Sequence, residues 1–459
     1  MYQIDFHKPL HIYFCGIGGI SMSGLAEILL DRGFQVSGSD MKESPLTEAL
    51  SAKGATVYIG QRAANVTADI DCIVFTSAIH PDNPEYRKAM ELNLAAMTRA
   101  QLLGQLMTNY QCPIAISGTH GKTTTTSMVS DILMAADTDP TISVGGILET
   151  IGGNIRVGNS DYFVTEACEY TNSFHSFFPK ISIILNVEED HMDFFHDLQE
   201  IRDSFHTFAK LLPEDGLLII NGDIEHYDEL TRDLPCRVLT FGKSDNCDYY
   251  PTDIMHNSLG HTSALIHTGT GEAFTLELRV PGDHNLYNAL AAFALADYLG
   301  IDRNTTLAAL KVFTGSKRRF EYKGSLGDIV IIDDYAHHPT EITATLTAAQ
   351  DYAHHDLWCV FQPHTYTRTK AFMDEFAQAL SLADRIVLAD IYPARETDNL
   401  GISSRDLQAK IQALGKDCYY FTSFDAIENF LLENLINNDM VITMGAGDIV
   451  KVGEKLLGI

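Results

Sequence analysis

Three regions of the chain share one pattern of hydrophobic and polar positions: a short apolar run, a glycine-containing turn, then an amphipathic helical stretch. They lie at residues 10–33, with a further apolar run at 35–40, at 113–136, and at 328–456, where the pattern recurs several times. Short apolar strands that alternate with helices predict parallel sheets covered by helices on both faces, so the predicted fold class is α/β. Ligands of such sheets bind at the carboxyl ends of the strands, which is where these glycine turns fall.

The chain has 459 residues, which is too long for one ordinary core. We predict domain boundaries near residues 108 and 315, giving domains at 1–108, 109–314 and 315–459. The first boundary precedes the strand that enters a GTHGKT turn, and the second follows a helix ending around Phe313, in the polar stretch TGSKRR. The three units share a pattern of elements but no repeated sequence.

The amino-acid composition limits the classes of partner and the compartment that we expect. A formal charge of −29 argues against a nucleic-acid partner, although a few cations and backbone amides suffice to bind a nucleotide. The eight cysteines are scattered singly, as is typical of free thiols in a reducing compartment. No apolar stretch approaches the length of a membrane span, and the N-terminus lacks a signal-peptide pattern, so we expect a cytoplasmic protein without membrane insertion.

The strongest motif is a phosphate-binding turn between the strand PIAIS and a helix. Its backbone N–H groups and the following helix N-terminus would cradle phosphate oxygens, with the lysine on the β- and γ-phosphates and a threonine hydroxyl on Mg²⁺. The loop is two residues shorter than the usual form, because Ile116 stands where the first glycine is expected. The alternative is a chance glycine turn. The motif comprises Gly118, Thr119, His120, Gly121, Lys122, Thr123 and Thr124.

A cation site is predicted beside this turn. Residues 162–165 form a predicted strand that ends at Glu166, and a second predicted strand, from Ile181, ends near Asp190 and His191. A carboxylate and an imidazole at adjacent strand ends could hold one or two Mg²⁺ ions. The alternative is that both are ordinary polar loop residues.

A second glycine turn, GIGGIS, follows the strand HIYFC, and Asp40 ends the next strand, where a ribose-binding acid is expected. The dinucleotide fingerprint is imperfect because Ser21 occupies the third glycine position. The residues alone leave three interpretations open: NAD(P) binding, binding of another nucleotide diphosphate, and a purely structural turn.

Eight motifs together resemble the Mur ligases of peptidoglycan synthesis, in the same order and over nearly the whole chain: GTHGKTT, EACE, EEDHMD, PGDHNLYNALAA, GSKRRFE, DDYAHHPTE, FQPHTYTRT and GAGDI. The resemblance implies three domains: a Rossmann-like N-terminal domain for a UDP-sugar, a central ATPase domain with a P-loop-type turn, and a Rossmann-like C-terminal domain for an amino acid. It implies an ATP-dependent ligase with ATP and Mg²⁺ as cofactors. The implied substrates are UDP-N-acetylmuramate, activated as an acyl phosphate, and L-alanine.

The resemblance also assigns residues to sites. For the UDP-sugar they are Gly16, Gly18, Gly19, Asp40 and Ser77; for ATP, the phosphate turn with His284, Asn285, Asn288, Arg319 and Asp334; for the metal, Thr123, Glu166 and His191; for the amino acid, His338, His364 and Arg368; for catalysis, Lys122, Glu166, His191 and His337. Structural alternatives stay open. Asn285 and Asn288 could cap a helix, Arg319 could form a surface salt bridge, and His337 or His338 could cap the helix begun by Pro339.

Two departures from the family pattern concern the substrates. Thr365 stands where the family's motif has arginine, and the acidic run is EACEYTNSF, in which Glu166 is retained and the role of Glu169 is open. Rival functions are a ligase that attaches a tripeptide to the same sugar nucleotide, an NAD(P)-dependent oxidoreductase, and a non-catalytic nucleotide-binding regulator. We expect a monomer or a homodimer.

Overall fold

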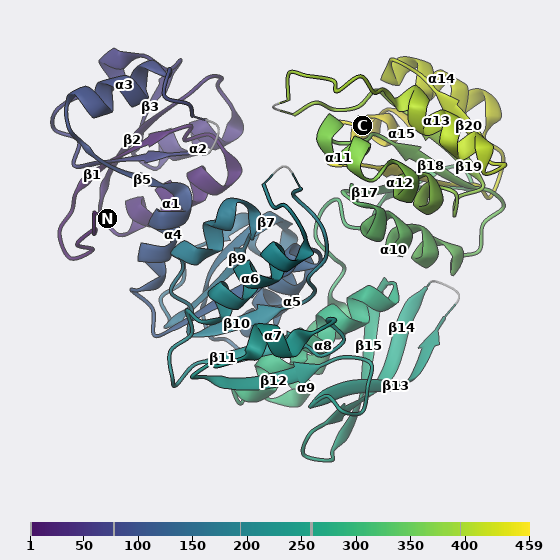
Figure 1. The fold of residues 1–459 in the computed structure, drawn as a ribbon, viewed down its shortest axis with the longest axis horizontal. Helices are drawn as coiled ribbons and strands as arrows, with labels where there is room; N and C mark the ends of the chain where they lie inside the picture. Colours follow the sequence, from purple (N-terminus) through teal and green to yellow (C-terminus); the bar gives the residue numbers. More distant parts are fainter. Residues whose placement is uncertain (1, 77–78, 193, 258–259, 395) are drawn as a thin grey trace.

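Three β-sheets follow one another along the chain in the computed structural model, which describes residues 2–76, 79–192, 194–257, 260–394 and 396–459 (Figure 1). The N-terminal and C-terminal sheets lie at the upper left and upper right of Figure 1, and the central sheet lies below them. Residues 108 and 315 each lie between the last helix packed on one sheet and the first strand of the next. No helix of the described residues is long and apolar enough to span a membrane.

The N-terminal sheet has five parallel strands in the order β3-β2-β1-β4-β5, which is the order of a Rossmann-like sheet without its sixth strand. The strands are β1 (His11–Cys15), β2 (Gln35–Asp40), β3 (Thr56–Ile59), β4 (Cys72–Phe75) and β5 (Ala95–Thr98). The helices are α1 (Ile20–Asp31), α2 (Pro45–Ala52), α3 (Pro84–Glu91) and α4 (Arg99–Met107), with a 3-10 turn, η1 (Ala63–Asn65). The α/β prediction is confirmed for this part of the chain.

The central sheet has ten strands in the order β15-β14-β13-β12-β11-β10-β6-β9-β7-β8. They are β6 (Cys112–Ser117), β7 (Thr141–Leu148), β8 (Gly153–Arg156), β9 (Tyr162–Ala167), β10 (Ile181–Ile184), β11 (Leu217–Asn221), β12 (Arg237–Phe241), β13 (Tyr249–His256), β14 (His261–Thr268) and β15 (Ala273–Pro281). Helices α5 (Lys122–Ala135), α8 (Asp283–Tyr298) and α9 (Arg303–Val312) cover one face, and α6 (Leu198–Ala209) and α7 (Tyr227–Thr231) the other. Two 3-10 turns, η2 (Glu149–Ile151) and η3 (Tyr170–Ser176), complete this part.

The expectation of purely parallel sheets is wrong for both ends of the central sheet. Strands β13, β14 and β15 pair antiparallel, as do β7 and β8. The β14–β15 turn shows why: Gly271 has a φ of 83°, and Thr268 and Glu272 are hydrogen-bonded across the turn. A glycine in this conformation closes a tight hairpin, which joins antiparallel strands, and a parallel pair would need a long crossover.

The C-terminal sheet has six strands in the order β16-β17-β21-β18-β19-β20, all parallel except the edge strand β16. They are β16 (Glu321–Leu326), β17 (Ile329–Asp334), β18 (Leu357–Phe361), β19 (Arg385–Leu388), β20 (Asp417–Tyr420) and β21 (Met440–Met444). Helices α10 (Pro339–Gln350), α12 (Met373–Leu380) and α13 (Ser404–Ala413) cover one face, α14 (Phe424–Asn434) and α15 (Val450–Leu457) the other, and α11 (Tyr366–Ala371) precedes α12.

The N-terminal part is docked on the central part through close backbone contact. A single apolar cluster contains buried residues of both parts. A Cβ atom at Gly24 of α1 would lie 2.1 Å from Ile155 Cγ1, and a Cβ at Gly104 of α4 would lie 1.8 Å from the Ser176 carbonyl oxygen. Only glycine allows helices α1 and α4 to come this close to the central part.

The docking of α4 gives a stability prediction. Alanine has a higher helix propensity than glycine by about 1 kcal/mol, yet we expect Gly104→Ala to lower the free energy of unfolding by about 1–3 kcal/mol, because its methyl group would overlap the Ser176 carbonyl. Urea denaturation measures this. The matched control is Gly453→Ala in α15, whose Cβ would lie 3.2 Å from Ile331 Cγ2 and should cost less than Gly104→Ala, because its neighbour needs to move by only a few tenths of an ångström. Equal midpoints for Gly104→Ala and the wild type would contradict the inferred packing.

Candidate functional site

The site is built at the carboxyl edge of three neighbouring parallel strands. Strand β6 pairs with β9 on one side and with β10 on the other, so Ser117 lies opposite both Ala167 and Ile184. The loops that leave these strands therefore meet, although they lie far apart in the sequence. They contain the phosphate turn, the acidic run that includes Glu166 and Glu169, and residues 185–191.

The phosphate turn between β6 and α5 has the backbone conformation that its glycines allow. Gly118 and Gly121 have φ values of 144° and 83°, and a Cβ at Gly121 would lie 2.5 Å from Asn288 Oδ1. Asn186 fixes the turn from the neighbouring loop: its Oδ1 accepts the His120 N–H at 2.7 Å, and its Nδ2 donates to the His120 carbonyl at 3.1 Å. These bonds support a loop that is two residues shorter than usual.

Lys122, the first residue of α5, is folded back into the turn. Its ammonium donates to the Gly118 and Thr119 carbonyls and forms an ion pair with Glu169 at 3.0 Å. Burial alone disfavours the charged lysine, but the Glu169 carboxylate raises the pKa of Lys122 above its usual value. Glu169 is itself buried, with a side-chain exposure of 3%. The lysine is therefore charged, and the turn and Glu169 fix its position.

The predicted metal residues Glu166 and His191 lie on either side of this pair. Glu166 belongs to β9, and its Oε1 accepts the Gly145 N–H at 2.5 Å. His191 Nε2 lies 3.8 Å from Glu169 Oε1, and burial is the main cause that lowers the pKa of His191. The prediction that the second strand ends near Asp190 is wrong, because β10 ends at Ile184. The backbone leaves the sheet there, and His191 has a φ of 55° in the loop that follows.

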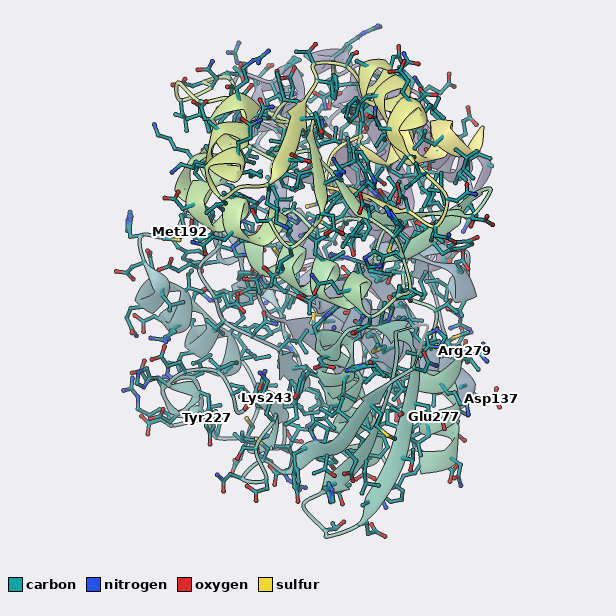
Figure 2. All side chains as sticks on the ribbon, turned by 90° about the vertical axis from the view of Figure 1, so that its right-hand side faces the viewer. Asp137, Met192, Tyr227, Lys243, Glu277 and Arg279 are labelled. Carbon is teal, nitrogen blue, oxygen red and sulfur yellow. The ribbon has the colours of Figure 1, made fainter. Side chains whose placement is uncertain are left out.

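A pocket of about 570 Å³ opens beside the phosphate turn. Of the residues predicted for ATP, those that line it are His120, Gly121, Thr124, His284, Asn285, Asn288, Arg319 and Asp334. Glu188, Lys243 and Glu341 line it too, and Lys243 is labelled in Figure 2. Helix α8 begins at Asp283, so the suggestion that Asn285 or Asn288 caps this helix is wrong. Asn285 Nδ2 instead donates to the Pro281 carbonyl at 2.7 Å, inside the first turn.

Glu341 of α10 connects the C-terminal part to this pocket. Its carboxylate lies 3.3 Å from His120 Nδ1, 3.6 Å from Arg319 and 3.3 Å from His337 Nδ1. Burial by itself would raise the pKa of Glu341, but the neighbouring cationic and imidazole groups hold it well below its usual value. Arg319 therefore lies at the pocket with a buried partner, and it is not a surface salt bridge.

Asp334 ends β17 and is held in place by its neighbours. Its carboxylate accepts hydrogen bonds from the N–H groups of Phe320 and Ala336 and from the Thr345 hydroxyl, at 3.0, 2.7 and 3.1 Å. Burial raises the pKa of Asp334 to about 6. Its position at the carboxyl end of a C-terminal strand brings the third part of the chain to the nucleotide pocket.

A second, smaller pocket of about 180 Å³ lies where the central and C-terminal parts meet. Its lining includes Asp190, His191, His337, His364 and Arg368. Met192, which also lines it, is labelled in Figure 2 at the height where these two parts of the chain adjoin. The pocket unites the predicted amino-acid residues His364 and Arg368 with two predicted catalytic histidines.

Arg368 is tied to the central part by Asp190, whose Oδ1 lies 3.0 Å from Arg368 Nη2. Both side chains are nearly buried, and the arginine overcomes the effect of burial and holds the pKa of Asp190 far below its usual range. Thr365, at the position of the family's arginine, has a φ of 66° and caps α11. A positive φ is costly for a β-branched residue, and Thr365 lies in the wall of the second pocket.

The two adjacent histidines differ in position: His338 caps a helix and His337 lines the second pocket. His338 is the N-cap of α10, where Nδ1 accepts the Thr340 N–H at 3.4 Å, and its Nε2 lies 3.1 Å from the Glu189 carbonyl. It does not line the second pocket, so its predicted contact with the amino acid has no support in this geometry. His337 does line that pocket, but burial lowers its pKa to about 3, which makes it a weak base.

The N-terminal glycine turn lies at the start of α1. Gly16 has a φ of 91°, and Gly19 is the N-cap, so no side chain of the N-cap residue occupies the first N–H groups of the helix. Asp40 Oδ2 accepts the Gly18 N–H at 2.9 Å and thereby fixes the turn. Ser77, also predicted for the UDP-sugar, lies outside the described residues.

The side chains of His120, Glu188 and His338 form a group whose ligand atoms lie within 4.8 Å of one another. This spacing would suit a metal ion, but its members already have other contacts: Glu341 lies near His120, the Thr340 hydroxyl donates to Glu188, and His338 contacts the Glu189 carbonyl. Burial would lower the pKa of His120, yet Glu188 and Glu341 raise it to about 9. The group is thus a charged contact between the central and C-terminal parts.

Three residues that position the site were not singled out from the sequence: Asn186, Glu341 and, as a partner of Lys122, Glu169. Each lies in or beside a family motif, but a polar residue in a loop has no periodicity that reveals its contacts. A carboxylate next to a phosphate-turn lysine is the signal that could have identified Glu169.

The buried N-cap gives a pH prediction. Burial lowers the pKa of His338 to about 4, from 6.5 in an unfolded chain, so the unfolded chain takes up a proton that the folded protein excludes. Stability should therefore fall as the pH drops from about 6.5 toward 4. His120, with a pKa of about 9 in the folded protein and 6.5 in an unfolded chain, gives a slope of opposite sign near pH 6.5, which vanishes at lower pH where both states are protonated. Urea midpoints at pH 6.5 and 5 should shift less in His338→Asn, which keeps an N-cap acceptor, than in the wild type; equal shifts would contradict the assignment.

Three family models match consecutive parts of the chain. The Mur ligase family, catalytic domain matches residues 11–111, the Mur ligase middle domain matches 116–296, and the Mur ligase, glutamate ligase domain matches 318–447. Together they cover all three sheets described above.

Two curated relatives match over the full length of the chain. The UDP-N-acetylmuramate–L-alanine ligase of Lachnospira eligens is 58% identical over 458 residues, which cover 100% of both proteins. The ligase of the same name from Agathobacter rectalis is 55% identical over 457 residues, again 100% of both.

Solved structures show the same architecture. The UDP-N-acetylmuramate-alanine ligase MurC from Thermotoga maritima has a TM-score of 0.82 at 30% identity and 98% coverage of both chains. The murein peptide ligase Mpl from Psychrobacter arcticus has a TM-score of 0.73 at 26% identity and the same coverage. The chain belongs to the Mur ligase family, and within it to the group of the UDP-N-acetylmuramate–L-alanine ligases.

Proposed function

We propose that this protein joins L-alanine to the carboxylate of UDP-N-acetylmuramate at the expense of ATP, in the synthesis of peptidoglycan precursors. The observation that carries the proposal is the position of Lys122. It begins the helix behind the phosphate turn that lines the larger pocket, and Glu169 links it to His191 of the smaller pocket. A cation between two pockets suits the transfer of a phosphoryl group from a nucleotide to a second substrate.

ATP fits the larger pocket. The backbone of the turn and the N-terminus of α5 supply N–H groups for phosphate oxygens, and Lys122 supplies a fixed positive charge. Asn285, Asn288, Arg319 and Asp334 line the remainder of the pocket and would contact the nucleoside.

Mg²⁺ would be held by Thr123, Glu166 and His191, whose oxygen and imidazole donors suit a divalent cation. Glu166 and the neutral His191 both lie near the buried Lys122–Glu169 pair. The ion would neutralise charge on the phosphate oxygens during transfer.

The reaction needs two steps because a carboxylate oxygen is a poor leaving group. The sugar carboxylate attacks the γ-phosphorus of ATP, ADP leaves, and an acyl phosphate results. Lys122 stabilises the charge that spreads over the transferred oxygens. The amine of L-alanine then attacks the acyl carbon, and phosphate leaves from the tetrahedral intermediate.

The attacking amine must lose a proton, and His191 suits this role better than His337 in a state in which its imidazole does not hold the metal ion, because a metal-bound imidazole has no free lone pair for a proton. Both histidines line the smaller pocket, but the pKa of about 3 for His337 leaves it little affinity for a proton. Arg368 and His364 would orient the amino acid, and the Arg368–Asp190 pair closes the C-terminal part over the central part and keeps water from the acyl phosphate. We place the enzyme in the cytoplasm, where its eight free cysteines stay reduced.

The activity is tested by phosphate release from ATP with UDP-N-acetylmuramate and Mg²⁺. Release should require the sugar nucleotide and be fastest with L-alanine among L-alanine, glycine, L-serine, D-glutamate and the tripeptide. Reactions without amine or without sugar are the controls. Preference for the tripeptide would instead assign the chain the rival activity, the attachment of a tripeptide to the same sugar nucleotide. The absence of phosphate release with any amine would refute the proposed reaction.

The role of Lys122 is tested by separating binding from turnover. Lys122→Ala should abolish turnover, because the phosphoryl oxygens lose their cation, and should leave binding of UDP-N-acetylmuramate largely intact, because that ligand is expected on the N-terminal turn. Titration calorimetry and the phosphate assay measure the two quantities. The matched control is Lys180→Ala, which removes an ion pair with Asp215 at the start of β10 and should keep full activity. Loss of sugar-nucleotide binding in a folded Lys122→Ala protein would contradict the division of sites.

A further inference from the structure

Arg99 lies between the N-terminal glycine turn and the acidic end of β9. It is the first residue of α4, and its Nη1 donates to the Ser21 hydroxyl at 2.9 Å. Ser21 belongs to the first turn of α1, directly after the glycine turn. The guanidinium thus reaches from one helix N-terminus to another, and both helix ends favour an anion.

Arg99 has an acidic neighbour, Glu166, but forms no ion pair with it. Within the described part of the chain no ion pair includes Arg99, and the bond to Ser21 is its one hydrogen bond, although a guanidinium has five N–H donors. Burial lowers the pKa of Arg99, against the opposing influence of Cys168 and Glu166. A partly buried cation without an ion-pair partner is costly unless an anion from outside neutralises it.

The packing of α4 keeps Arg99 in this position. Gly104, one and a half turns further along the helix, lies against the Ser176 carbonyl of η3, and the opposite wall is fixed by the bond from Asn154 Nδ2 to the Ile20 carbonyl at 3.0 Å. These contacts fix the backbone of α4 beside α1, and the bond to Ser21 places the Arg99 guanidinium next to the glycine turn.

We propose that Arg99 binds an oxyanion of the sugar nucleotide. The inference rests on the proposed function and goes beyond it by naming a cation for this substrate. The sugar nucleotide has two such groups, the pyrophosphate, expected at the glycine turn, and the carboxylate, which must reach the phosphate turn. Arg99 is bonded to Ser21 directly after the glycine turn, and its planar fork suits two-point contact with either group.

The test is titration calorimetry with UDP-N-acetylmuramate, in the presence of Mg²⁺ and a non-hydrolysable ATP analogue. Arg99→Gln should weaken binding about tenfold to a hundredfold, and Arg99→Lys should restore part of the affinity. The matched control is Arg32→Gln, which removes an exposed cation from the other end of α1 and should bind like the wild type. Affinities of Arg99→Gln and Arg32→Gln within twofold of each other would overturn the proposal.

UDP-N-acetylglucosamine distinguishes the two oxyanions, because it has the pyrophosphate and lacks the carboxylate. If Arg99 binds the pyrophosphate, both sugar nucleotides lose affinity in Arg99→Gln; if it binds the carboxylate, only UDP-N-acetylmuramate does. Either result supports the proposal. Failure of the wild-type protein to bind UDP-N-acetylmuramate would instead refute the proposed function.

Thermal unfolding separates binding from a structural role. Without ligand, Arg99→Gln should unfold at the same temperature as the wild type or higher, because it removes an unbalanced, partly buried charge. With UDP-N-acetylmuramate the wild type should gain more stability than the variant. A variant that is destabilised without ligand and stabilised by it as much as the wild type would show that Arg99 serves only the fold.

Discussion

The pairing of β6 with β9 and β10 is the constraint on which the site depends. In this parallel arrangement three strands end at one edge, so their following loops must share the same space. The phosphate turn leaves β6, Glu166 and Glu169 come at and after the end of β9, and Asn186 follows β10. A shift of one residue in the β6–β9 pairing would turn Glu166 to the other face of the sheet and break the contact between Lys122 and Glu169.

At this edge of the sheet the charged side chains lie in ion pairs. The Lys122–Glu169 pair is the most buried, and the Glu341 and Asp190 carboxylates serve His120, Arg319 and Arg368 in the same way. A buried charge that has a partner keeps its ionised form and its position, which is the preorganisation that phosphoryl transfer needs. Nucleotide phosphates would compete with Glu169 for Lys122, because the Glu169 carboxylate contacts the ammonium group that a phosphate would contact.

The two outer parts of the chain contact the central part through different kinds of interaction. The N-terminal part shares an apolar cluster with it and approaches it through Gly24 and Gly104. The C-terminal part has apolar clusters of its own, and its contacts to the central part at the site are ion pairs and hydrogen bonds. Polar contacts exchange with water at little cost, so the C-terminal part is the one suited to open and close around the substrates.

The sequence by itself determined the local elements and the motifs at their ends. It predicted β1 and β2, the phosphate turn with Lys122, and the alternation that makes two Rossmann-like parts, because apolar periodicity and glycine conformations are local properties. It misjudged the length of β10 and the antiparallel hairpins, since a run of apolar residues does not reveal its pairing partner.

Only the tertiary structure decided which polar residues meet. It paired Lys122 with Glu169, joined Glu341 to His120, assigned His338 to a helix cap and left Arg99 without an ion-pair partner in the described residues. Such contacts depend on strand order and on the close approach of helices, which bring together residues far apart in the chain. Their charges then set one another's pKa, so the chemistry of the site is a property of the folded molecule and not of its motifs.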